Sequence, residues 1–182
     1  IVQFQFSDLT IKLAESRDYR SLLERYHYLS NAGRGGIAYG AYLGDQIIAV
    51  CVFSPLPRQN IISDQNAREL SRLCIHPSYR IPNFGSWLIS RCIKMLAKKY
   101  QTIISYADTS YGHSGGIYLA SNFYLDARVS PDYWYRSTDG WIMHKKTLYN
   151  KAVNLCLTES EYASRFGFTK VWGLEKLRYR FD

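Results

Sequence analysis

One stretch of the chain, residues 69–100, restricts the fold more than any other. Its first part, residues 69–75, reads as a β-strand, and apolar residues then recur at helical spacing over residues 85–100. The helical positions Leu88, Cys92 and Leu96 share one face, with basic residues on the other side. A strand that leads through a turn into a helix is typical of α/β proteins. The stretch therefore predicts an α/β fold.

The rest of the chain extends this pattern to a mixed sheet. Gly44 and Asp45 predict a tight hairpin, and Thr158 with Glu161 has the spacing of a helix capping box. Without repeats, low-complexity tracts or linkers, we expect a single domain over residues 1–182, an α/β fold with a mixed central sheet flanked by helices. The expected strands are residues 2–6, 37–43, 46–53, 69–75, 102–107, 133–135 and 141–144, with a final strand near Val171 or at 178–181; the expected helices are 18–28, 85–100, 115–123 and 158–166.

Composition excludes several other classes of protein. Of the 182 residues, 47% are hydrophobic and 21% are charged, which is too apolar for intrinsic disorder. The longest apolar run, residues 47–53, is far shorter than the ~20 residues of a membrane-spanning helix, so we expect no membrane partner. The cysteines include no Cys-x-x-Cys pair, which favours a reducing compartment and a cytoplasmic protein. Because the first residue is Ile1 and not Met, we expect residues to be missing before it.

The chain is basic and rich in tyrosine. Lys and Arg number 23 against 15 Asp and Glu, a formal net charge of +8, and there are 16 Tyr. This combination favours a polyanionic partner such as nucleic acid. Cations near a helix C-terminus have a structural explanation, because they complement the helix dipole. The basic residues without such an explanation are the expected nucleic-acid contacts: Lys145, Lys146, Arg178 and Arg180.

The turn before the long helix has the sequence Arg80-Ile-Pro-Asn-Phe-Gly85. A helix N-terminus with free N–H groups attracts anions, although an ordinary strand-to-helix turn is the simpler interpretation. The turn resembles the Arg/Gln-x-x-Gly-x-Gly/Ala pyrophosphate loop of the GCN5-related N-acetyltransferase (GNAT) superfamily, which implies acetyl-CoA or a related acyl-CoA as cofactor. Asn83 stands for the first Gly, and Pro82 removes a backbone donor. The resemblance assigns the cofactor to the strand residues Leu73, Cys74 and Ile75 and the loop residues Arg80, Asn83, Phe84, Gly85 and Ser86.

Residues 105–123 hold the candidate proton donor. They read as a strand that ends in Asp108, a polar turn with His113 and a short helix that carries Tyr118. The sequence Tyr118-Leu-Ala-Ser-Asn-Phe123 resembles the Tyr-x-x-x-Gly-Phe pattern of the same superfamily, whose tyrosine protonates the departing sulfur. Without the resemblance, Tyr118 is explained equally well as a core or rim tyrosine.

Several blocks in order carry a narrower resemblance, to the phage Mom family of DNA-adenine modification proteins, a branch of the GNAT fold. It implies a transferase that adds a carbamoylmethyl or other acyl-derived group to the exocyclic amine of adenine in double-stranded DNA and so protects it from host restriction nucleases. It also implies the host cytoplasm if the chain is phage-encoded, with a homodimer as one option. The blocks are Tyr26-His-Tyr-Leu29, Arg34-Gly-Gly-Ile-Ala-Tyr-Gly40, Glu69-Leu-Ser-Arg72, Ser86-Trp87, Ser105-Tyr-Ala-Asp108, Gly112-His113, Ile117-Tyr118 and His144-Lys-Lys146.

The same resemblance implies which residues are functional. It assigns catalytic roles to five residues, Tyr118, Asp108, His27, Ser71 and Arg72. An iron centre is a further option, for which His27, Asp108 and His113 would form a two-His, one-carboxylate set. Each assignment has a structural alternative. His27 fits a helix cap and Asp108 a turn cap, while Arg72 fits an ion pair with Glu69.

Two other functions fit the same residues. The first is an ordinary acetyl-CoA-dependent N-acetyltransferase that acts on RNA, a protein or a small amine. The second is a nucleic-acid-binding module that kept the fold and lost the chemistry. A modified deoxyadenosine in cellular DNA would separate the DNA-modifying enzyme from both.

Overall fold

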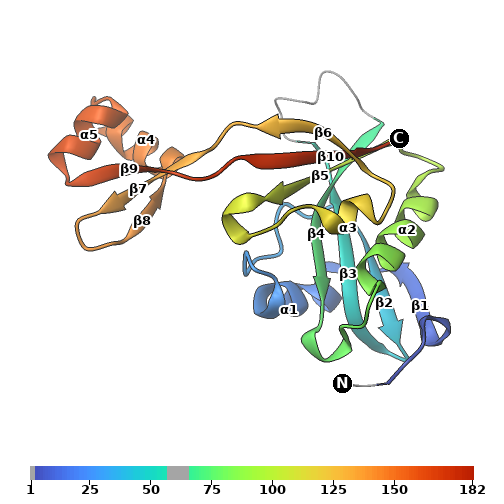
Figure 1. Cartoon of the computed structure of the whole chain (residues 1–182). Coiled ribbons are helices and arrows are strands. Elements are labelled where there is room, and N and C mark those ends of the chain that lie inside the picture. The colour runs from blue at the N-terminus through green and yellow to red at the C-terminus, as the bar shows by residue number, and fades with distance from the viewer. Residues whose placement is uncertain (1–2, 57–65) are drawn as a thin grey trace. The chain divides into compact units, whose positions relative to one another are not determined.

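Seven strands of the described residues form one mixed sheet (Figure 1). The computed structural model describes residues 3–56 and 66–182. Neighbouring strands from β1 to β4 are antiparallel, and β4 runs parallel to β5. The expected α/β fold with a mixed central sheet flanked by helices is confirmed. In sheet order the strands are β1 (Leu9–Leu13), β2 (Ile37–Leu43), β3 (Gln46–Ser54), β4 (Ala67–Ile75), β5 (Thr102–Asp108), β10 (Lys176–Phe181) and β6 (Tyr124–Val129).

Helices α1 (Ser16–Tyr26) and α2 (Phe84–Leu96) cover opposite faces of this sheet. Alternate side chains of a strand point to opposite faces. On β3, Val52 packs in the cluster that holds the buried side of α1, whereas Cys51 lies against Cys92 of α2. β3 is therefore buried on both faces, which explains why its sequence is a continuous apolar run.

The remaining helical segments of the described chain are short. α3 (Gly116–Leu119) is a single turn, and three 3-10 turns cover Phe6–Asp8, Pro77–Tyr79 and Thr109–Tyr111. α4 (Lys145–Asn154) and α5 (Glu159–Arg165) follow in the C-terminal third. None of the described helices is both long and apolar enough to cross a membrane.

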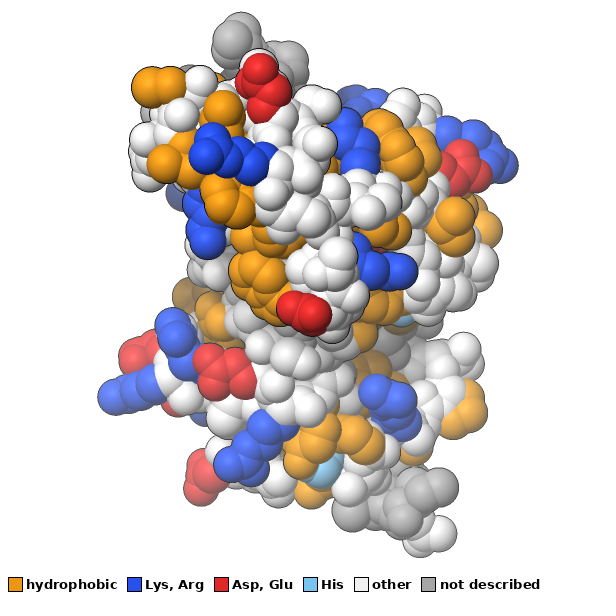
Figure 2. Space-filling model, turned by 90° about the vertical axis from the view of Figure 1, so that its left-hand side faces the viewer, with side chains coloured by type: hydrophobic (Ala, Val, Ile, Leu, Met, Phe, Trp, Pro, Cys, Tyr) orange, Lys and Arg blue, Asp and Glu red, His pale blue; other side chains and the backbone are white. Residues whose placement is uncertain are grey.

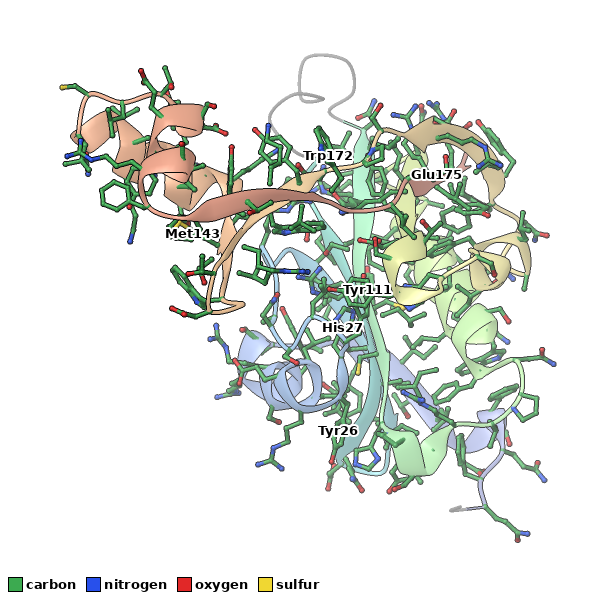
Figure 3. All side chains as sticks on the ribbon, turned by 60° about the vertical axis from the view of Figure 1, so that its left-hand side comes forward. Tyr26, His27, Tyr111, Met143, Trp172 and Glu175 are labelled. Atoms are coloured by element: carbon green, nitrogen blue, oxygen red, sulfur yellow. The ribbon has the colours of Figure 1, made fainter. Side chains whose placement is uncertain are left out.

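The described residues separate into two compact units. The first lies within residues 1–106, 115–127 and 178–182, and the second comprises residues 107–114 and 128–177. The second unit has a sheet of its own, with α4 and α5 packed on a core in which Tyr135, Met143 and Leu148 are buried (Figure 3). The expectation of a single domain stays a prediction. The strand order of this second sheet is β8 (Ile142–His144), β7 (Tyr133–Ser137) and β9 (Phe168–Trp172).

The expected strand over residues 2–6 is wrong for its described part, and Val2 lies outside the described residues. Residues 3–5 have no regular structure, and the first strand begins only at Leu9. The alternating aromatic side chains of this segment pack against α2 instead of forming a strand. Phe6 stacks on Trp87 of α2 with ring centroids 4.6 Å apart, and Phe4 packs edge-on against Phe84 at 5.6 Å. The segment therefore covers α2 with aromatic rings and does not extend the sheet.

Candidate active site

The centre of the candidate site is the point where β4 and β5 separate. Their parallel register runs from Ala67 and Thr102 only as far as Glu69 and Ile104. Just beyond it, the Ser105 hydroxyl donates a hydrogen bond of 2.8 Å to the Leu70 carbonyl. From Leu70 to Ile75, β4 continues to pair with β3 on its other side. This part of β4 therefore has one edge whose backbone groups can pair with an extended ligand.

The N-terminus of α2 lies beside the far end of β4. Its first residue follows Asn83, whose positive φ of 63° places it in the left-handed region, and no side chain caps the helix there. Gly85 packs so tightly that an added Cβ would lie 2.5 Å from Ile117 of α3 and 3.7 Å from Ile75 of β4. The Ser86 hydroxyl donates to the Asn83 carbonyl at 3.1 Å. Glycine at position 85 therefore lets α2 pack closely on α3 and β4, and a helix N-terminus without a side-chain cap fits the pyrophosphate of a coenzyme A.

The residues assigned to the cofactor contribute differently to this end of the site. The Phe84 side chain is fully buried and packs against Phe6, and the Phe84 N–H donates to the Ile81 carbonyl at 3.3 Å. Cys74 is also buried, and its thiol donates to the Leu22 carbonyl at 3.7 Å. Arg80 is exposed at the end of the Pro77–Tyr79 turn, just before the N-terminus of α2.

Tyr118 places its hydroxyl at the separation of β4 and β5. It forms a side-chain hydrogen bond with Ser105, and its hydroxyl donates to the Tyr106 carbonyl at 3.4 Å. Burial raises the pKa of Tyr118 to about 12, although the Ser105 hydrogen bond acts in the opposite direction. The ring packs against Phe123 and Tyr179, with centroids 5.7 and 5.3 Å away. Tyr118 therefore keeps its proton at neutral pH, as a proton donor must.

The raised pKa of Tyr118 predicts weaker folding in alkali. Tyr135, buried against Glu159, also has its pKa raised to about 12 by burial and by that carboxylate. An unfolded tyrosine titrates near pH ~10, so the neutral phenols favour the folded state below that pH. This contribution is lost as the pH rises through about 12. Thermal unfolding from pH 8 upward should show Tm falling above pH ~10, and the fall should be shallower in Tyr118→Phe. An equally steep fall in that variant would contradict the titration of Tyr118.

Two charged residues that the sequence did not assign to the site act on the neighbouring Tyr106, and one of them, Glu69, also acts on Tyr118. Glu69 is largely buried and forms an ion pair with Arg34 from the loop before β2. Its charge raises the pKa of Tyr118 and of Tyr106. Both residues stand in blocks that resemble the Mom family, which was the only sequence signal for them.

Arg72 fastens the loop before β2 onto β4. Its guanidinium Nη2 donates to Oδ1 of Asn31 at 2.7 Å, and its Nε donates to the Asn31 carbonyl at 3.3 Å. Gly33 leaves room for it, because a Cβ there would lie 2.9 Å from the guanidinium carbon. Glu69 forms its close ion pair with Arg34 and not with Arg72, although its charge still acts on the Arg72 guanidinium. The contacts support a positioning role for Arg72.

Ser71 also helps to hold the loop before β2 on β4. The β3–β4 register shifts here, so Ser71 is an extra residue on β4. Its hydroxyl oxygen lies 2.6 Å from that of Ser54, which in turn donates to the Gly35 carbonyl at 2.5 Å. The bulge therefore ties the loop before β2 to two strands.

His27 lies at the C-terminal end of α1, where it is 7% exposed (Figure 3). Its Nδ1 accepts a hydrogen bond of 3.1 Å from the Leu29 N–H, and its ring lies 4.5 Å from that of Tyr28. This arrangement matches the helix-cap alternative. The catalytic role of His27 stays a prediction.

Asp108 belongs to the second unit, at the end of β5. One carboxylate oxygen accepts the Ser110 N–H at 3.0 Å, and the other lies 3.4 Å from Nζ of Lys176. Within residues 3–56 and 66–182, no three His, Cys, Asp or Glu side chains are grouped as a metal ion requires. The iron centre expected from His27, Asp108 and His113 is therefore not supported.

Three of the four expected nucleic-acid contacts are held in ion pairs. Lys145 lies 2.5 Å from Asp132, Arg178 lies 2.6 Å from Asp126, and Arg180 lies 2.9 Å from Asp182. Lys146 is exposed, and no ion-pair partner faces it in the described part of the chain. Lys146 is therefore the member of this set whose charge is most available to a phosphate.

Comparison with known families gives one match that spans nearly the whole chain. The model described as the Mom protein family matches residues 8–181. No curated protein matches the chain.

The fold also matches solved acetyltransferase structures. The ribosomal-protein-S18-alanine N-acetyltransferase from Escherichia coli shares 14% identity at a TM-score of 0.57, covering 95% of this chain and 92% of that one. A Bacillus subtilis acetyltransferase in complex with CoA shares 18% at 0.56, covering 96% and 98%. A GNAT family acetyltransferase from Elizabethkingia anophelis with acetyl-CoA bound shares 13% at 0.57, also covering 96% and 98%. At these identities the matches establish the fold, which is that of GNAT acetyltransferases.

Proposed function

Because the chain belongs to the Mom protein family, we propose that it is a transferase that adds an acyl-derived group, of the carbamoylmethyl type, to the exocyclic amine of adenine in double-stranded DNA. The observation that carries the transferase part is the position of Tyr118. Its protonated hydroxyl lies with Ser105 at the point where β4 and β5 separate. A partly buried proton donor beside a free strand edge suits a reaction with a thiolate leaving group.

The chain's own groups fit an acyl-CoA. The free edge of β4 over Leu73–Ile75 would pair with the pantetheine arm, and the N-terminus of α2 with Arg80 would hold the phosphates. When bound, an acyl-CoA would supply an activated acyl carbon, whose transfer to the adenine amine with loss of the thiol would give an N-acyl group. A carbamoylmethyl group, joined through its CH2 carbon, would need an amide nitrogen from a further donor. Tyr118 holds at its phenolic oxygen the proton that the leaving sulfur requires. Pro82 offers no N–H, so Asn83, Gly85 and Ser86 would carry the backbone contacts.

The part of the candidate site that would contact the adenine is polar. Glu69, its partner Arg34 and the Tyr106 side chain lie within electrostatic reach of one another. An adenine edge carries both donors and acceptors, and a base must leave the stack before its amine can react. A carboxylate and a guanidinium held together near Tyr106 would suit the recognition of such an edge.

Nucleoside mass spectrometry tests the proposal. DNA from cells that express the wild-type chain should contain a modified deoxyadenosine, and the mass of the added group distinguishes carbamoylmethyl from acetyl. Unchanged DNA beside newly acetylated RNA or protein would support the ordinary N-acetyltransferase instead. DNA binding without any product would support the inactive binding module.

The Lys146 side chain gives a test of DNA contact. If its free ammonium touches a phosphate, Lys146→Ala should reduce the slope of log affinity for duplex DNA against log salt by about one unit. Lys145→Ala is the matched control, because Lys145 is already paired with Asp132 and should change the slope less. Equal slopes in wild type and Lys146→Ala would place Lys146 outside the DNA contact.

A further inference from the structure

The sheet of the second unit has one covered and one open face. Tyr135 and Met143 are buried with Leu148 of α4, whereas their strand neighbours point the other way. Those neighbours meet across the sheet, because Trp134 pairs with His144 and Arg136 with Ile142. All are exposed or partly exposed. We call this surface the open face, and its residues are Trp134, Arg136, Ile142, His144, Thr169 and Val171.

The open face carries one cation, Arg136, and no carboxylate. Arg136 is exposed and has no ion-pair partner among the residues that the structure describes. Asp132 next to β7 is occupied by Lys145, and Glu159 accepts hydrogen bonds from tyrosines on the covered side. Asp139 lies in the turn after β7, outside the strands. The charge of the face is therefore complementary to a polyanion.

Trp134 gives the open face a fixed aromatic plane. Gly173 lies directly against it, since a Cβ on Gly173 would lie 2.7 Å from the indole ring. The backbone of Gly173 is itself held, because its N–H donates to the Asp132 carbonyl at 2.8 Å. Across the sheet from Trp134 lie His144 and Val171, and Ile142, which is 48% exposed, lies across from Arg136. Figure 2 shows that surface Lys and Arg side chains are interspersed with hydrophobic ones.

A held aromatic plane next to an unpaired guanidinium is what proteins use for unpaired nucleic-acid strands. Bases stack on the aromatic ring, and cations hold the phosphates. A paired duplex hides its base faces, so the apolar part of the open face would have no partner there. We propose that the open face binds an unpaired stretch of DNA. The inference rests on the proposed function, because an enzyme that reaches the adenine amine in a duplex must leave nucleotides unpaired.

Fluorescence anisotropy of the full chain with a labelled single-stranded DNA oligonucleotide, over a series of salt concentrations, tests the proposal. Arg136→Ala should lower the salt slope by about 0.7, the value for one phosphate of a single strand. Trp134→Leu should weaken binding at least about fivefold, whereas Trp134→Phe, which keeps a stacking ring, should bind more tightly than Trp134→Leu. Lys151→Ala is the matched control. It removes one exposed charge from α4, which packs on the other face, and should leave both quantities unchanged.

The outcomes separate this inference from the proposed function. If Arg136→Ala and Trp134→Leu, shown by circular dichroism to be folded, bind like Lys151→Ala, the open face is not the site. Tighter binding of an RNA oligonucleotide of the same sequence, or no binding of the wild-type chain, would also overturn the inference. Nucleoside mass spectrometry on the same variants reports the proposed function independently. If modified deoxyadenosine forms but the open-face variants bind single-stranded DNA normally, the inference is wrong and the proposed function still stands.

Discussion

Replacing Tyr118 by Phe is expected to lower turnover by about 10²–10⁴-fold. The change removes only the hydroxyl that lies with Ser105 at the separation of β4 and β5. The ring contacts with Phe123 and Tyr179 remain possible, so the fold should be kept. The rate at which modified deoxyadenosine forms, followed by mass spectrometry with purified chain, DNA and acyl-CoA, measures the loss. The KM for the acyl-CoA should change little, because the hydroxyl acts on the leaving group and not on binding.

The matched control is Tyr26→Phe, which removes another phenolic hydroxyl of the same unit. Tyr26 is 38% exposed, and its ring packs against His76. We expect its turnover to stay close to wild type. Unchanged turnover in Tyr118→Phe would end the proton-donor role. A loss of turnover that comes with a lowered Tm would make Tyr118 a structural residue instead.

The parts of the fold that neighbouring residues determine were predictable from the sequence. The Thr158 hydroxyl accepts a hydrogen bond from the Glu161 N–H, and the Glu161 carboxylate accepts one from the Thr158 N–H, as their spacing predicted. Gly44 adopts a positive φ of 60° in the expected hairpin. The insertion of β10 between β5 and β6 was not predictable, because strand order depends on pairings between segments far apart in the chain.

The candidate site shows the same contrast between features set by neighbouring residues and features set by distant ones. Tyr118 could be named as a candidate because its motif is local, and the structure places it with Ser105. The Arg34–Glu69 pair joins residues 35 positions apart and depends on the bulge at Ser71. The catalytic role expected for Arg72 stays a prediction, and its bonds to Asn31, 41 positions away, show that it also holds the loop. Spacing along the sequence carries no information about such contacts until the strands are paired.

The loop before β2 predicts the second large effect, which is on stability. Gly36 has a φ of 141°, and a Cβ there would lie 2.1 Å from the Phe53 carbonyl oxygen. That conformation is nearly restricted to glycine, and the obstacle is backbone, which cannot rotate away. Gly36→Ala should therefore lower the free energy of unfolding by about 3 kcal/mol or more. Urea unfolding of both proteins measures the difference.

Gly35→Ala is the control for the backbone conformation alone. Gly35 also has a positive φ, of 72°, but nothing lies within 4 Å of an added Cβ. Its replacement should cost only about 1–2 kcal/mol. Equal losses in the two variants would show that the close approach to Phe53 contributes nothing. If the approach matters, Gly36→Ala should also reduce turnover in the fraction that remains folded. The displaced loop would break the hydrogen bond from Ser54 to the Gly35 carbonyl. It would also shift Arg34 away from Glu69, the carboxylate whose charge acts on Tyr118.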